Sequence, residues 1–69
     1  GITREKMICV VVEGLTGKHL SFPEAQELLR EKGILTEQLE AEMKDGEGTP
    51  TFAEMLVLLA NTYEYLLEK

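Results

Sequence analysis

The stretch Thr51–Leu67, TFAEMLVLLANTYEYLL, is the most apolar part of the chain and predicts a long helix. Its large apolar side chains recur at a helical period. They are Phe52, Met55, Leu56, Leu59, Tyr63, Leu66 and Leu67, and the stripe is widened by Val57, Leu58 and Ala60. Because so little polar face remains, we expect neighbouring segments to cover this helix on several sides. We therefore expect it to form the centre of the domain.

Two helix starts are marked by the capping-box spacing, a hydroxyl residue followed three positions later by glutamate. One is Thr51 with Glu54, preceded by Pro50, which prevents a helix from continuing into it. The other is Ser21-Phe22-Pro23-Glu24, with proline in the first turn, where its missing N–H costs nothing. These signals predict helix starts after residues 21 and 51.

The first third of the chain is ambiguous between helix and strand. Met7–Val12 is rich in β-branched residues and, taken alone, could be a buried strand. No second strand-like segment is present to pair with it, which favours a helix. We expect this helix to begin after Thr3 as N-cap, to run to about Glu13, and to end at Gly14 and Gly17.

The remaining elements follow from the same rules. A second helix is expected over Phe22–Lys32, ended by Gly33, and a short third helix over Glu37–Lys44, opened by Thr36. Asp45–Pro50 is expected to be the most flexible loop. The prediction is a small all-α, four-helix, single-core domain covering residues 1–69, built as two helix-loop-helix units.

The core predicted from these patterns draws on all four helices. Since the last helix is expected to be central, Leu59→Ala should cost about 2–5 kcal/mol. The predicted core residues are Met7, Ile8, Val11, Leu15, Phe22, Ala25, Leu28, Leu29, Ile34, Leu39, Phe52, Met55, Leu56, Leu59, Tyr63 and Leu66.

Composition excludes several classes of function. The chain has 7 Lys and Arg against 13 Asp and Glu, and a net charge of -6, which repels nucleic acids and anionic lipid. Its longest apolar runs are too short to insert across a membrane. The single cysteine, Cys9, excludes an internal disulfide. Gly1 in place of an initiator Met suggests a piece of a larger protein, from which any targeting segment has been removed.

The sequence offers few residues that could act in catalysis or bind a metal. His19 is the only histidine, and Cys9 lies in an apolar run, so neither a nucleophilic pair nor a zinc site can be assembled. The many carboxylates of residues 37–47 are typical of a solvated helix face rather than an acid–base pair. The chain is predicted not to be an enzyme, with no catalytic residue, no cofactor and no metal.

Three motifs, in order along most of the chain, resemble the S-layer homology module of bacterial surface proteins. Ile2–Met7, ITREKM, looks like the start of the module's "ITRAEF" helix, and Ala25–Leu35, AQELLREKGIL, is similar to its first helix and "GI" turn. Pro50–Met55 falls near the expected distance for a second start, with Phe52 in place of the family's arginine. The aspartate-glycine-aromatic-proline loop that precedes this start in the family is absent.

The resemblance implies a non-catalytic interaction module of a larger bacterial surface or envelope protein. Such a module acts in attachment to the cell wall or in association with neighbouring repeats. In the family a threonine–arginine pair helps to hold anionic wall polysaccharide, so Thr3 and Arg4 are the candidate ligand-binding residues. The implied partners are wall polysaccharide, neighbouring repeats or another protein, and the implied location is the cell surface.

A second resemblance, to a degenerate EF-hand pair, implies a different class of function. Met43–Glu54 has the glycine turn and the closing glutamate of a calcium loop, but Met43 stands where the first ligand should be and Pro50 where an apolar strand residue should be. This alternative is an intracellular helix-loop-helix adaptor that binds a partner protein in the cytoplasm. Calcium binding is not expected in either case.

Overall fold

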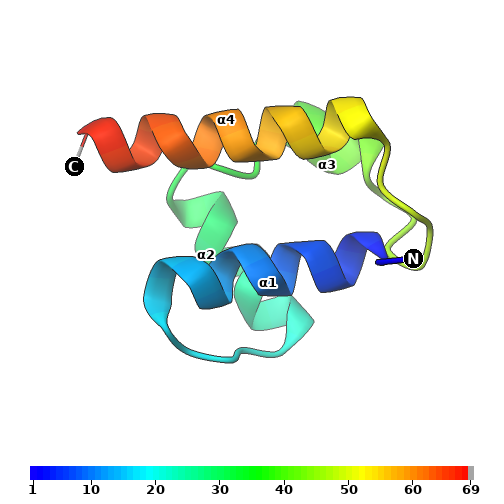
Figure 1. Ribbon diagram of the computed structural model, residues 1–69, viewed down its shortest axis with the longest axis horizontal. Helices are drawn as coiled ribbons and strands as arrows, with labels where there is room; N and C mark the ends of the chain where they lie inside the picture. The colour runs from blue at the N-terminus through cyan, green and yellow to red at the C-terminus, as the bar shows by residue number, and fades with distance from the viewer. Residues whose placement is uncertain (69) are drawn as a thin grey trace.

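The computed structural model describes residues 1–68, whose regular secondary structure is all helical, with no strand among those residues. Four helices follow one another along the chain: α1 (Arg4–Thr16), α2 (Phe22–Glu31), α3 (Glu37–Glu42) and α4 (Phe52–Glu68). The described part has a radius of gyration of 11.0 Å and measures 31 × 23 × 19 Å. Figure 1 shows the arrangement of the helices. The prediction of a small all-α, four-helix domain is confirmed.

The helix starts are set by local capping, as the sequence indicates. The hydroxyls of Thr3 and Thr36 each accept the backbone N–H three residues on, at 3.1 and 3.2 Å. Thr51 and Glu54 form a complete capping box, in which each side chain bonds the backbone N–H of the other, at 3.0 and 3.1 Å. Ser21 and Glu24 form a second capping box at the start of α2. Four short segments therefore define where the elements begin, independently of packing.

Met7–Val12 is helical, which confirms the preference for helix over strand. The helix α1 extends to Thr16, beyond the predicted end at Glu13, with Gly14 inside it. It ends at Gly17, whose φ of 74° is a left-handed conformation that suits glycine. The N–H of Gly17 closes the helix on the carbonyl oxygen of Glu13 at 2.8 Å.

The helices pack as two pairs, α1 with α2 and α3 with α4. This confirms the two helix-loop-helix units. The pairs are joined by residues 32–36 and, on the outside, by Arg30 of α2, which contacts Glu40 of α3 at 2.7 Å. In Figure 1, α1 and α4 run in the same direction along opposite sides of the molecule, and both begin beside the connection that leads into α4.

The core lies between α1, α2 and the segment from residue 34 to residue 43, and a single residue of α4 completes it. The predictions for Met7, Ile8, Ala25, Leu29, Ile34 and Leu39 are confirmed, whereas the burial of four further residues was not predicted. Those four are Val12, Leu35, Met43 and Leu58.

The prediction that the last helix is central is wrong. Its apolar residues Phe52, Leu56, Leu59, Tyr63 and Leu66 were expected in the core, yet they are between 49% and 71% exposed. Only Glu54 and Leu58 of α4 are buried. The helix α4 therefore covers one side of the core with a narrow face and lies along the edge of the molecule (Figure 1). The large loss of stability predicted for Leu59→Ala is instead expected for Leu58→Ala, because the neighbouring Leu58 is fully buried.

Candidate functional site

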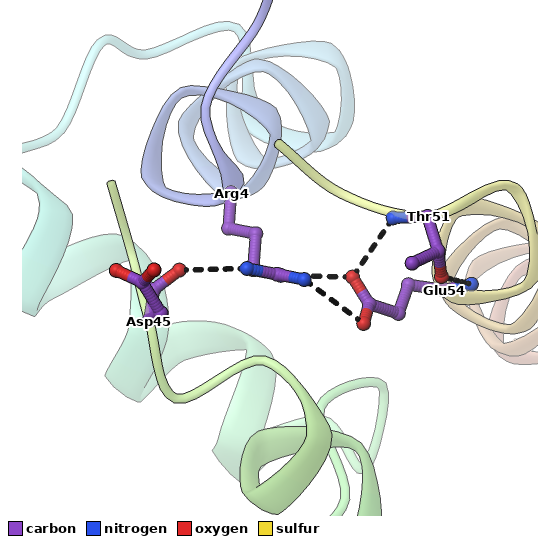
Figure 2. Close-up of polar contacts among 4 residues, drawn as sticks. All are labelled: Arg4, Asp45, Thr51 and Glu54. Carbon is purple, nitrogen blue, oxygen red and sulfur yellow. Dashed lines mark hydrogen bonds and ion pairs between the residues drawn. The ribbon is translucent and has the colours of Figure 1, made fainter. Parts of the chain in front are cut away.

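The two candidate ligand-binding residues lie at the first turn of α1 and make contacts within the chain. Thr3 is the N-cap of α1, where its hydroxyl accepts the N–H of Lys6. The Arg4 guanidinium is only 14% exposed and meets Glu54 through two hydrogen bonds, Nε to Oε1 at 2.8 Å and Nη2 to Oε2 at 3.3 Å. Figure 2 shows this pair together with Asp45 and Thr51.

Glu54 links the start of α4 to the start of α1. Its Oε1 accepts both the Arg4 side chain and the backbone N–H of Thr51, so one carboxylate completes a capping box and an ion pair. The hydrogen bond from Arg4, and then that from the Thr51 backbone, lower the pKa of Glu54 below its usual value. The same hydrogen bond raises the pKa of Arg4 above its usual value. Both groups are therefore charged at neutral pH.

The loop before α4 also binds the start of α1. The carbonyl oxygens of Gly48 and Gly46 accept the backbone N–H groups of Arg4 and Glu5, at 2.9 and 3.0 Å. The Asp45 carbonyl oxygen accepts Nη1 of Arg4 at 3.1 Å. These bonds satisfy N–H groups that have no partner inside a helix. A β-carbon on Gly48 would collide with the Arg4 guanidinium, and one on Gly46 with the Glu5 side chain, so a larger residue at either position would displace that side chain.

A pocket of about 260 Å³ opens beside Arg4, between α1, α2 and the segment after α3. Its charged lining combines the cations Arg4 and Lys44 with the acids Glu5 and Glu40, and Phe22 forms part of its apolar wall. The volume is at the lower limit of small-molecule sites, roughly 300–1,000 Å³.

In the segment that resembles a calcium loop, key residues pack in the interior or bind other parts of the chain. Met43 and Pro50 are buried, and Glu54, the closing ligand of the EF-hand pattern, is held by Arg4 and Thr51. Within residues 1–68, no group of three or more His, Cys, Asp or Glu side chains is placed to hold a metal ion.

The residues considered for catalysis lie apart. His19 is exposed, with its Nδ1 3.2 Å from a carboxylate oxygen of Glu13. Cys9 is a free thiol that is partly buried against the core. The structure does not bring them into one site.

The largest exposed apolar feature is what we call the outer face of α4: Phe52, Leu56, Leu59, Tyr63 and Leu66. Leu67, which is also exposed, flanks it, whereas the exposed Val57 lies beside α3. Soluble monomers rarely expose contiguous apolar patches larger than a few hundred Å², and larger ones mark interaction sites. The outer face is therefore the strongest candidate for a functional surface.

The opposite side of α4, which faces the rest of the domain, is more polar than the outer face. Besides the buried Leu58, it carries Glu54, Asn61 and Tyr65. Asn61 donates its side-chain N–H to the Ile34 carbonyl oxygen at 3.0 Å. Lys32 contacts the Tyr65 hydroxyl at 3.1 Å and lies 5.1 Å from the centre of the ring. The usual amphipathic order, apolar inward and polar outward, is thus inverted along α4.

Sequence analysis missed this surface, although a signal for it is present. Glu54, Asn61 and Tyr65 fall on one face of a helix at spacings of seven and four residues, which sets three polar groups against the apolar stripe. The pattern was interpreted as a helix covered on most sides. It also fits a helix that uses its polar face for specific contacts inside the domain and keeps the stripe for a partner.

Searches with family models, among curated proteins and among solved structures find no significant match to this chain. In the part of the chain that the structure describes, no helix combines the length and apolar character needed to cross a membrane. The likeness to the S-layer homology module therefore rests on the motifs themselves.

Proposed function

We propose that this chain is a non-catalytic interaction module of a larger bacterial surface protein, similar to an S-layer homology repeat. Its main contact surface is the outer face of α4, through which it associates with a neighbouring repeat or another protein partner. Attachment to anionic wall polysaccharide through the start of α1 is a second role of the same module. The observation that carries the proposal is the inverted polarity of α4.

The exposed fractions on α4 support association through this helix. Covering Phe52 and Tyr63, which are 71% and 66% exposed, would remove two large aromatic surfaces from water. Aromatic side chains are enriched at protein interfaces, where they dominate the energetics. A helix whose outer residues were only solvated would carry charged side chains there instead.

A role in wall attachment is supported by the position of Arg4 beside a pocket that also contains Lys44. The contacts of Arg4 with Glu54 and Asp45 do not engage every N–H of the guanidinium, so an anionic sugar substituent could still bind. The net charge of -6 opposes such binding, and an ion pair already satisfies part of Arg4. Wall attachment is therefore the weaker part of the proposal.

The experiment is retention on purified cell-wall material, using the longer protein with its flanking sequence. Four versions are compared: wild type, Leu59→Asp, Arg4→Gln and Glu54→Gln. Loss of retention in Leu59→Asp, with helical content unchanged by circular dichroism, would support a role of the outer face in the association that keeps the protein on the wall. Full retention by all three variants, or no retention of the wild type, would contradict the proposal.

Glu54→Gln is the matched control for Arg4. Both substitutions weaken the same ion pair and so perturb stability in the same direction, but only Arg4→Gln removes the cation. If Arg4 binds polysaccharide, Arg4→Gln lowers retention while Glu54→Gln maintains or increases it. Equal losses in the two variants would show that Arg4 acts only through the fold.

A further inference from the structure

We propose that the occupant of the outer face of α4 is the same face of a second copy of this chain, with the two helices antiparallel. The inference deepens the proposed function and rests on it, because both use this face. It commits to one partner where the proposed function leaves the partner open. The argument depends on spacing, symmetry, charge and area.

The spacing of the outer-face residues is that of a helix-pairing seam. Phe52, Leu56, Leu59, Tyr63 and Leu66 follow one another at four, three, four and three residues, the a/d pattern of a coiled coil. A surface patch without such a pattern could receive any apolar shape. A seam of this period is shaped to interlock with another helix.

The two ends of the seam, Phe52 and Leu66, lie seven residues on either side of its middle residue, Leu59. In an antiparallel pair Leu59 lies against its own copy on the two-fold axis, and Phe52 lies opposite Leu66 of the copy. A two-fold interface uses the same patch on both chains, so it must be complementary to itself. Phe52 then faces Leu66, and Tyr63 lies level with Met55, next to Leu56, so larger side chains meet smaller ones, which favours interdigitated packing.

The positions beside the seam are free of charge. They are Ala53, Met55, Ala60, Thr62 and Leu67. A chain with a net charge of -6 would be expected to repel its copy. Here the helices can approach without bringing two like charges together, and the alanines permit a short distance between the axes.

Charge also selects the antiparallel orientation. Within Phe52–Glu68 the charged side chains are all acidic, and two of the three, Glu64 and Glu68, lie in the last turns. A parallel pair would gather four such carboxylates at one end. An antiparallel pair separates them, two at each end of the pair.

The area is sufficient for a stable pair. The six large apolar residues on and beside the outer face would, if fully covered, bury on the order of 600 Å² per copy, judged from the size of such side chains. The total clears the roughly 1,000 Å² expected of a biological interface. The helix α4 is already ordered by its capping box and by Leu58, so pairing does not have to offset the cost of forming it.

The test is sedimentation equilibrium of the 69-residue chain over a concentration range from micromolar to millimolar. We expect a dimer fraction that rises with concentration, and a monomer at every concentration for Leu59→Asp. The matched control is Val10→Asp on α1, since Val10 is 51% exposed and lies off this face. It should dimerise as the wild type does. Wild type that remains monomeric throughout, or Leu59→Asp that still dimerises, overturns the proposal.

Orientation is tested by disulfide cross-linking in a Cys9→Ala background. Antiparallel pairing predicts that Phe52→Cys forms a disulfide with Leu66→Cys when the two variants are mixed, and that neither forms one alone. Efficient self-linking of Phe52→Cys would show a parallel pair and overturn the orientation. A chain that is monomeric would overturn the pairing between copies. The proposed function would still stand if Leu59→Asp abolished wall retention of the longer protein.

Discussion

Arg4 and Glu54, fifty positions apart in the chain, form a two-pronged ion pair that joins the first turns of α1 and α4. The two side chains are 14% and 9% exposed, so water screens them less than it screens the other ion pairs of the molecule. The same carboxylate completes the capping box of α4, and the same arginine binds the loop carbonyl of Asp45. Loss of either partner should therefore affect two helix starts together.

We predict that Arg4→Gln lowers the melting temperature by several degrees, because it leaves the Glu54 carboxylate without its ionic partner. Arg30→Gln is the control, since Arg30 is 47% exposed and pairs with Glu27 and Glu40 at the surface, where such pairs contribute little. Thermal unfolding followed by circular dichroism measures both. An equal effect of the two substitutions would contradict a special role for the Arg4–Glu54 pair.

The pKa of Glu54 predicts a pH dependence of stability. In the folded chain it lies below the ordinary value of 4.5, so the unfolded state binds a proton more readily. The stabilisation is complete above about pH 4.5, where the unfolded carboxyl is also ionised. It is lost as the pH falls through the lower folded value.

This pH dependence can be isolated with Glu54→Gln, which cannot titrate. The difference in unfolding free energy between wild type and Glu54→Gln should be constant from pH 7 to about pH 5 and shrink below that range. Urea unfolding at a series of pH values measures it. A difference that is unchanged at pH 3 would show that the ion pair does not stabilise the fold.

Neighbouring leucines of α4 should respond oppositely to truncation. Leu58 is fully buried, so Leu58→Ala should cost about 2–5 kcal/mol. Leu59 is 57% exposed, and Leu59→Ala should change the stability of the monomer by no more than about 0.5–1 kcal/mol. Unfolding at dilute concentration separates the two. A larger loss for Leu59 in a monomeric sample would restore α4 to the centre of the core.

Calcium should not bind at physiological concentration. The closing glutamate of the loop, Glu54, is already held by Arg4, and Met43 is buried where a ligand would be required. Asp45→Ala should change thermal stability by no more than ~0.5 kcal/mol, with or without calcium. A calcium-dependent rise in melting temperature that Asp45→Ala removes would favour the EF-hand-like alternative.

The sequence was sufficient to predict the helices because their signals are local. Thr3, Ser21, Thr36 and Thr51 act within three or four residues, and Gly17 ends α1 through its own backbone conformation. The ends were less accurate than the starts. The predicted third helix extended to Lys44, whereas α3 ends at Glu42, since few apolar contacts hold so short a helix.

The orientation of α4 could not be predicted because it depends on partners that are distant in the sequence. Periodicity ranks the faces of a helix by apolarity, and on that ranking the stripe from Phe52 to Leu66 faces inward. The structure instead turns the polar side inward, where Arg4 and Lys32 meet Glu54 and Tyr65. For the same reason Arg4 was interpreted as a ligand-binding residue, and its position in the fold was not foreseen.

The bonds between the loop carbonyls of Gly46 and Gly48 and the first turn of α1 have a consequence for folding order. The amide groups that begin α1 find their acceptors more than forty residues later, so the first helix pair cannot be fully formed before the second has docked. Such long-range contacts close late, because loop closure must come first. We expect the two halves to fold and unfold as one cooperative unit, and a chain still missing residues 45–54 to have a frayed first helix.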